Sequence, residues 1–252
     1  MKKIKVGIVN YLNTAPLIYG LKKSSIIESI ELIPDFPANL ARDLISGKID
    51  IGLVPVAAIP HLKEWWIIGD YCIGANGAVA SVCLFSQVPL DEVELIMLDN
   101  QSRTSVALAK ILVRHHWKMD VQFVDAVDGF ENDISGTTAA VVIGDRALRQ
   151  KQHSKYHYDL AEAWMKFTGL PFVFAAWVSN KPMDQEFVTR FNEANAYGVH
   201  NIESVVASLP NPDHFDLEEY FRKYISYTLD GEKKKGLQKF LHFLDPAITV
   251  SM

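Results

Sequence analysis

The sequence has few cysteines and no long apolar run. Its two cysteines, Cys72 and Cys83, lie in apolar stretches, so we expect buried, reduced thiols and neither a disulfide framework nor a cysteine metal site. No apolar run approaches the roughly 20 residues of a membrane span. The first residues, Met-Lys-Lys-Ile-Lys, lead directly into a short strand-like run, which is too short for a signal peptide. These absences predict a cytoplasmic protein without a membrane-spanning segment.

Patterns for nucleic acids, nucleotides and metals are also missing. The formal net charge of -5 disfavours a nucleic-acid partner, which usually requires a basic patch. There is no Gly-x-Gly-x-x-Gly motif and no phosphate loop. The pairs His115-His116 and His153-x-x-x-His157 lack further ligands nearby, so we expect exposed histidines and no metal. A small molecule is therefore the expected partner, with no cofactor, and the oligomeric state is left open.

Strand and helix signals alternate along most of the 252 residues, which predicts an α/β fold built from parallel βαβ units. Helical spacing recurs from Asp184 onward. Helices are expected from Pro16, over 39–45 and over about 102–114. The strands are expected at 5–9, 30–33, 49–54, 81–85, 95–98, 121–124, 139–143 and 172–178.

The strands group into two βαβ series joined by two crossings. We predict that 1–86 and 176–252 form a discontinuous first lobe and that 87–175 form a second lobe. Ligands of open α/β sheets bind at the carboxyl ends of strands, and clefts between domains are common sites. The sequence therefore predicts a small-molecule site between the lobes.

Four segments place polar residues beside expected strands. Asn13 follows the first strand where a helix begins, so it either caps that helix or binds an anion. Ser81 follows the small residues 76–80, which fit either an ordinary turn or close approach to a ligand. Ser102, Arg103, Thr104 and Ser105 open a helix and offer hydroxyls, amides and a guanidinium to a carboxylate. The alternative for this segment is a Ser102 cap with Arg103 in solvent.

The fourth segment contains Gly144 and Asp145, again between a strand and a helix. Asp145 caps its helix or orients Arg146 toward the cleft, and capping is the simpler interpretation. The aromatic residues from Trp164 to Phe174 are interpreted as core, although one of them could cover a flat ring.

Taken in order, these segments resemble the chorismate dehydratase family of the futalosine route to menaquinone. The likeness covers about the first 180 residues. It is carried by Val6-Gly7, Tyr11-Leu12-Asn13-x-x-Pro16-Leu17, Leu44-x-x-Gly47-x-x-Asp50-Ile51-Gly52-Leu53-Val54-Pro55, Ser81, Ser102-Arg103-Thr104-Ser105, Ile143-Gly144-Asp145-x-Ala147-Leu148, Asp159-Leu160, and Trp164-x-x-x-Thr168-Gly169-Leu170-Pro171-Phe172-Val173-Phe174-Ala175-x-Trp177. One departure is Gly77-Ala78-Val79, where relatives often have a proline. The sister enzyme of the same route has a cysteine- and proline-containing first strand end, which this chain lacks.

The resemblance implies a two-lobed fold like that of type 2 periplasmic solute-binding proteins. It also implies removal of water from chorismate to give 3-[(1-carboxyvinyl)oxy]benzoate, with Asn13 and Ser81 as catalytic residues. Ser102, Arg103, Thr104, Ser105, Gly144 and Asp145 are then the expected substrate-binding residues. The alternative is a non-catalytic receptor for a small anion, which would bind its ligand without turnover.

Overall fold

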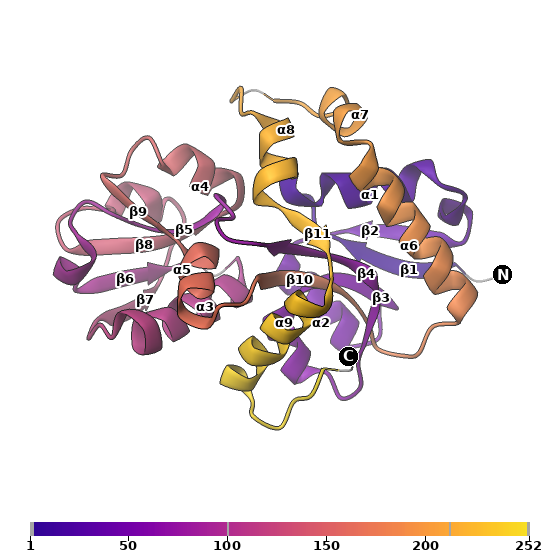
Figure 1. Ribbon diagram of the computed structural model, residues 1–252, viewed down its shortest axis with the longest axis horizontal. Helices are drawn as coiled ribbons and strands as arrows, with labels where there is room; N and C mark the ends of the chain where they lie inside the picture. Colours follow the sequence, from indigo (N-terminus) through magenta and orange to yellow (C-terminus); the bar gives the residue numbers. More distant parts are fainter. Residues whose placement is uncertain (1–2, 100, 212, 251–252) are drawn as a thin grey trace.

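The computed structural model describes residues 3–99, 101–211 and 213–250. In these ranges the strands form two sheets that lie side by side along the long axis of the molecule, with helices packed around each (Figure 1). The larger sheet has six strands in the order β11-β4-β10-β3-β1-β2, and the smaller has five in the order β7-β6-β8-β5-β9. Each sheet is the centre of one lobe.

The larger sheet combines a parallel half with an antiparallel half. Strands β1, β2 and β3 are parallel, whereas β10 runs antiparallel to both β3 and β4. Every residue of β3 is buried, as expected for a strand covered on both faces. The strands of this lobe are β1 (Ile4–Ile8), β2 (Ile30–Pro34), β3 (Ile51–Pro55), β4 (Trp66–Ala75), β10 (Phe172–Ser179) and β11 (Ser226–Thr228), and its helices are α1 (Ala15–Lys23), α2 (Pro37–Ile45), α6 (Gln185–His200) and α7 (Ile202–Ala207).

The smaller sheet has the same mixed character. Strand β6 is parallel to β7 and β8, while β5 is antiparallel to β8 and β9. Its strands are β5 (Val82–Ser86), β6 (Leu95–Leu98), β7 (Gln122–Asp125), β8 (Thr138–Ile143) and β9 (Tyr156–Asp159), and its helices are α3 (Arg103–Ile111), α4 (Gly144–Gln150) and α5 (Leu160–Thr168).

The sheet pairing differs from the predicted lobe boundaries at two strands. Strand β5 pairs within the smaller sheet, although 1–86 was assigned to the first lobe, and all of β10 pairs within the larger sheet, although the boundary was set at 175. The crossings therefore fall at 76–81 and 169–171. Strand β5 is buried throughout and β10 is buried except at Ala175, and such apolar runs do not reveal which sheet they join.

Two glycines let helices α1 and α6 approach closely. A Cβ atom on Gly198 would lie 1.8 Å from the carbonyl oxygen of Pro16, and one on Gly20 would lie 1.9 Å from that of Ala194. Distances this short are possible only without a side chain. Helix α1 starts two residues after Asn13. The close contact between α1 and α6 therefore fixes the position of the helix that directly follows Asn13.

The C-terminal segment returns to the junction of the two lobes. It contains α8 (Leu217–Glu219), the helical turn η7 (Tyr220–Tyr224), β11 and α9 (Gly231–Leu244). In Figure 1 the yellow segment from α8 to β11 runs down between the two sheets. The C-terminal segment is therefore placed beside the crossing at 76–81.

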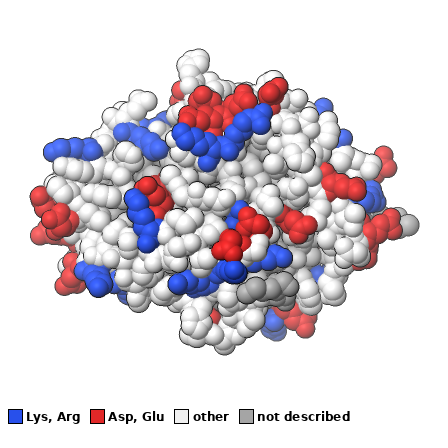
Figure 2. Space-filling view, viewed as in Figure 1, with Lys and Arg blue, Asp and Glu red and all other residues white. Residues whose placement is uncertain are grey.

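The surface carries charges of both signs, and both cysteines are buried. Figure 2 shows Lys and Arg side chains next to Asp and Glu on the face in view, with one mixed group above α8 and η7. Within α8 and η7, Arg222 pairs with Glu218 and Lys223 pairs with Glu219. Cys72 and Cys83 are both free and buried, as predicted.

Candidate active site

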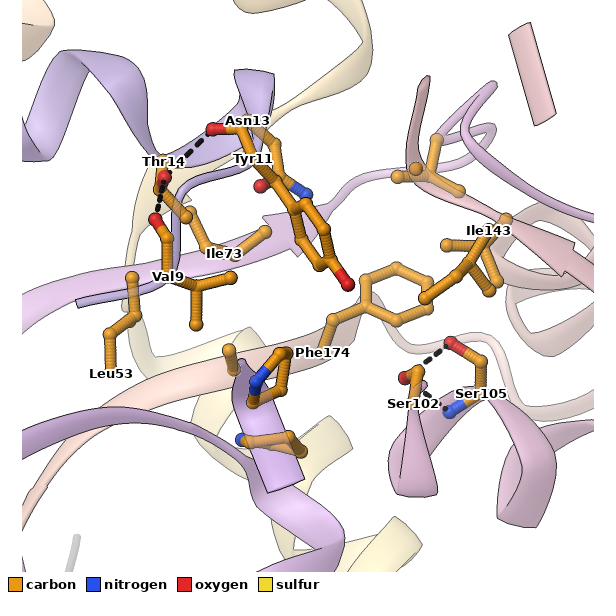
Figure 3. Close-up of a pocket in the computed structure, with 16 residues that line it drawn as sticks. Val9, Tyr11, Asn13, Thr14, Leu53, Ile73, Ser102, Ser105, Ile143 and Phe174 are labelled. Carbon is orange, nitrogen blue, oxygen red and sulfur yellow. Dashed lines mark hydrogen bonds between the residues drawn. The ribbon is translucent and has the colours of Figure 1, made fainter. Parts of the chain in front are cut away.

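A small pocket, with a cavity volume of about 70 Å³, lies between the two sheets. Clefts between domains are common sites for small molecules. The pocket is lined by Val9, Tyr11, Asn13, Thr14, Pro37, Leu53, Pro55, Ile73, Val79, Val82, Ser102, Ser105, Ile143, Gly144, Phe174 and Ala175. Figure 3 shows Tyr11 reaching from the Asn13 side toward the side of Ile143, with the Ser102–Ser105 pair on the second lobe. Both lobes therefore contribute to one cavity.

Asn13 lies in a short turn, Leu12–Thr14, between β1 and α1. The Thr14 hydroxyl shapes this turn by bonding the carbonyl oxygens of Val9 at 2.6 Å and Tyr11 at 2.8 Å. Tyr227 donates from its hydroxyl to the Asn13 carbonyl oxygen at 3.0 Å. The side-chain Oδ1 of Asn13 is buried and has no hydrogen-bond partner among the described residues. A buried acceptor without a partner is costly, and Asn13 is one of the residues that line the pocket.

Ser81 lies in the crossing between β4 and β5 and is fully buried. Its amide donates to the carbonyl oxygen of Val79 across Ala80, whose φ is 64°. This i→i+2 bond with a positive central φ is a γ-turn, which is strained for a residue with a side chain. Asp159 holds the turn because one carboxylate oxygen accepts from the amides of Val79 at 2.9 Å and Ala80 at 2.7 Å.

The Ser81 hydroxyl accepts a hydrogen bond of 2.8 Å from Tyr220. Its own proton has only a 3.5 Å contact, to the carbonyl oxygen of Val79. Ser81 is not among the residues that line the pocket, although Val79 and Val82 on either side of it are. The structure therefore places Ser81 directly behind the pocket wall.

The start of α3 divides the predicted group of four residues. Ser102 caps the helix by accepting from the Ser105 amide at 3.2 Å, and both serines line the pocket. Thr104 points the other way, since its buried hydroxyl accepts from the Ala57 amide of the first lobe. Arg103 is exposed and does not line the pocket. The structure thus brings Ser102 and Ser105 to the site and leaves Arg103 and Thr104 outside it. Asn100, in the same loop, lies outside the described residues.

Gly144 and Asp145 are separated in the same way. Gly144 lines the pocket with φ at 64°, and its amide donates to the carbonyl oxygen of Ser81 at 2.8 Å. Asp145 lines a neighbouring hollow beside Leu12 and α1. Burial raises the pKa of Asp145. Arg146 forms ion pairs with Asp99 and Glu131, so its charge is committed within the second lobe.

The described side chains that line the pocket are uncharged. Among the described residues that line it, none has a basic or acidic side chain. The first turn of α3 lies at this wall, and the dipole at the N-terminus of a helix favours an anion. Apolar residues from both lobes make up most of the remaining wall. This arrangement fits a small, largely apolar ring that carries a carboxylate.

Several residues at the site were not among the predicted site residues. Tyr11 spans the cleft with a 3.3 Å hydrogen bond to Gln101, and Phe174, expected to be core, lines the pocket. Tyr220 and Tyr227 lie far along the chain from the residues they bond, in a segment that looked undistinctive. The sequence offers a signal for two of these residues: Tyr11 belongs to a polar turn, and Phe174 belongs to the aromatic segment whose alternative was to cover a flat ring.

Neither a metal site nor a membrane span is found in the part of the chain that the structure describes. No group of three or more His, Cys, Asp or Glu side chains is placed to hold a metal ion there. The helices of the same residues include none that is long and apolar enough to cross a membrane.

Solved structures with a similar architecture include periplasmic binding proteins. A protein from Archaeoglobus fulgidus matches with a TM-score of 0.73 at 15% identity, over 98% of each chain. The periplasmic aliphatic sulphonate binding protein from Escherichia coli matches with a TM-score of 0.62 at 13% identity, over 98% of this chain and 93% of that one. At these identities the likeness concerns the fold, and it confirms the predicted two-lobed, periplasmic-binding-protein-like α/β fold.

The proteins related in sequence carry a more specific description than the solved structures do. A chorismate dehydratase from Thermus thermophilus is 26% identical over 97% of this chain and 96% of that protein. A chorismate dehydratase from Campylobacter jejuni is 28% identical over 93% of this chain and 95% of that protein. A family model described as menaquinone biosynthesis matches residues 4–245. The chain belongs to this menaquinone biosynthesis family.

Proposed function

We propose that this chain is a chorismate dehydratase, a hydro-lyase that converts chorismate to 3-[(1-carboxyvinyl)oxy]benzoate and water. Two relatives of this name align over nearly the whole chain. The structural observation that carries the proposal is the pocket between the lobes, to which Asn13 and the start of α3 contribute polar residues and whose remaining wall is largely apolar. We further propose that the reaction serves the futalosine route to menaquinone in the cytoplasm.

Substrate binding follows from the neutral wall of the pocket. One carboxylate binds at the first turn of α3, where the hydroxyls of Ser102 and Ser105 and the helix amides are donors. The ring lies against the apolar wall, with Phe174 and Ile143 on the pocket surface. Asn13 then meets the polar edge of the substrate from the other lobe.

The chemistry requires removal of one ring hydrogen and one hydroxyl. The C–H bond beside the ether breaks, its electron pair delocalises through one double bond onto the ring carboxylate, and the hydroxyl leaves with a proton as water. The ring becomes aromatic in this step. Fixed donors at the carboxylate that accumulates charge contribute roughly 3–4 kcal/mol per well-placed hydrogen bond.

The base is proposed to be the substrate itself. Among the described residues that line the pocket, none has a carboxylate, imidazole or amine side chain. The enolpyruvyl arm of chorismate carries a carboxylate close to the hydrogen that is lost. Asn13 holds this arm in its reactive bend from the pocket wall, with its side-chain N–H donating to the carboxylate, and Ser81 supports this arrangement from behind the wall.

Substitutions at the two residues test this function. Asn13→Ala and Ser81→Ala should each lower kcat by about two to three powers of ten through lost orientation, and the pH profile of kcat should show no enzyme base titrating near neutrality. Asp145→Asn is the control, because Asp145 lies outside the pocket. Loss of turnover in a folded, chorismate-binding Asp145→Asn variant would contradict the substrate-assisted step. Tight binding of chorismate by the wild type without turnover would instead support a receptor.

A further inference from the structure

Two buried tyrosines from the C-terminal segment each contact one of the residues proposed to be catalytic. Tyr220 of η7 donates to the Ser81 hydroxyl at 2.8 Å, and Tyr227 of β11 donates to the Asn13 carbonyl oxygen at 3.0 Å. Each tyrosine is 4% exposed. The two contacts join positions 139 and 214 residues apart in the sequence. One short segment therefore touches both halves of the proposed catalytic pair.

The segment is itself firmly placed. Strand β11 pairs with β4 on either side of Tyr227, through Ser226 with Gly74 and Thr228 with Tyr71. The helical turn η7 ends directly before β11, where the Ile225 amide donates to the Tyr220 carbonyl oxygen. Tyr227 is thus held by backbone pairing with the first lobe, and Tyr220 belongs to the helical turn that leads into that strand.

The two hydroxyls are fixed donors. Burial raises the pKa of Tyr220, and it raises the pKa of Tyr227 as well, so both phenols keep their protons across the working pH range. Phenylalanine would fill the same space without the cost of burying a hydroxyl. Packing alone therefore does not account for a hydroxyl at both positions.

We propose that Tyr220 and Tyr227 are positioning residues that fix Ser81 and Asn13 relative to each other. Tyr220 donates to the Ser81 hydroxyl and so fixes the orientation of this side chain behind the pocket wall. Tyr227 anchors the backbone of Asn13 and so sets the direction of its amide. This inference rests on the proposed dehydratase function.

The test measures kcat and KM for chorismate in Tyr220→Phe and Tyr227→Phe, with folded protein quantified by urea unfolding. Each change should lower kcat about tenfold or more, as expected for a small misplacement of a reacting group, and should leave KM within about threefold. Tyr224→Phe is the matched control, because Tyr224 belongs to η7 and contacts Lys151 and Lys223 at the surface. Its kcat should equal that of the wild type.

Double variants separate positioning from general stability. In a Ser81→Ala background, Tyr220→Phe should cause no further loss of kcat. In an Asn13→Ala background, Tyr227→Phe should likewise cause no further loss of kcat. Wild-type kcat in both phenylalanine variants, or losses that simply multiply in the double variants, would overturn the inference while the dehydratase function stands. A wild-type protein that does not convert chorismate would overturn both. If Tyr220→Phe does not fold, the Tyr227 cycle alone decides.

Discussion

Asp159 offers a sharp test of how the Ser81 turn is built. One of its carboxylate oxygens holds the amides of Val79 and Ala80, and the other accepts from Ala161 at 3.0 Å and Glu162 at 3.1 Å at the start of α5. A single side chain thus caps a helix and clamps the strained turn next to Ser81. We predict that Asp159→Ala damages both stability and turnover.

The size of the effect follows from the two contact pairs. Loss of a helix cap costs roughly 1 kcal/mol, and two hydrogen bonds to a charged group contribute roughly 3–6 kcal/mol. Burial of the carboxylate opposes these contacts and raises the pKa of Asp159, which offsets part of the gain. We expect the free energy of unfolding to fall by about 3 kcal/mol, estimated from the cap, the turn bonds and this offset.

The assay is urea unfolding combined with kcat per folded molecule. We expect kcat of Asp159→Ala to fall about tenfold or more, because the released γ-turn moves Ser81. Asp184→Ala is the control, since Asp184 caps α6 through a bond to Phe187 and touches no catalytic candidate. It should lose about 1 kcal/mol and keep wild-type kcat. An Asp159→Ala variant that is destabilised but fully active would refute the role of the turn.

Three further outcomes can be checked. Gly198→Ala should lower the free energy of unfolding by about 2–3 kcal/mol in urea, because its new Cβ would lie 1.8 Å from the Pro16 carbonyl oxygen; an unchanged midpoint would contradict the packing. Ser105→Ala should raise KM for chorismate about tenfold with little change in kcat, since one donor to the carboxylate is lost; an unchanged KM would place the carboxylate elsewhere. Because burial raises the pKa of Asp159 in the folded state, its ionisation costs stability as pH rises through the folded pKa. The wild type should therefore gain stability relative to Asp159→Asn as pH falls from 7 toward the unfolded value of about 3.9, and a difference that shrinks on acidification would contradict the shift.

Much of the secondary structure was predictable because buried strands are continuous apolar runs. The strand expected at 95–98 matches β6, and the one expected at 139–143 differs from β8 by a single residue. Strand β4 was not predicted. It contains Gly69 with φ at 75° and Asp70, and its pairing with β10 shifts register twice, so neither alternation nor a continuous run survives in its sequence.

The site was predictable where local geometry decides it. Ser102 and Ser105 are three residues apart, so they share a helix face, whereas Arg103 and Thr104 necessarily point elsewhere. That spacing alone could have separated the pocket residues from their neighbours. The partners of Ser81 could not be predicted in this way, because Tyr220 meets it only through the long-range return of the C-terminal segment.

The most direct test of the account is proton NMR of chorismate mixed with the purified chain. Dehydration should remove the signals of the hydrogens on the two saturated ring carbons and produce signals of aromatic hydrogens. The signals of the methylene hydrogens of the enolpyruvyl arm should persist in equal amount. The conversion should be catalytic and should slow by about two to three powers of ten in Asn13→Ala. Chorismate that binds and stays unchanged, or that releases its enolpyruvyl arm as pyruvate, would contradict the assigned reaction.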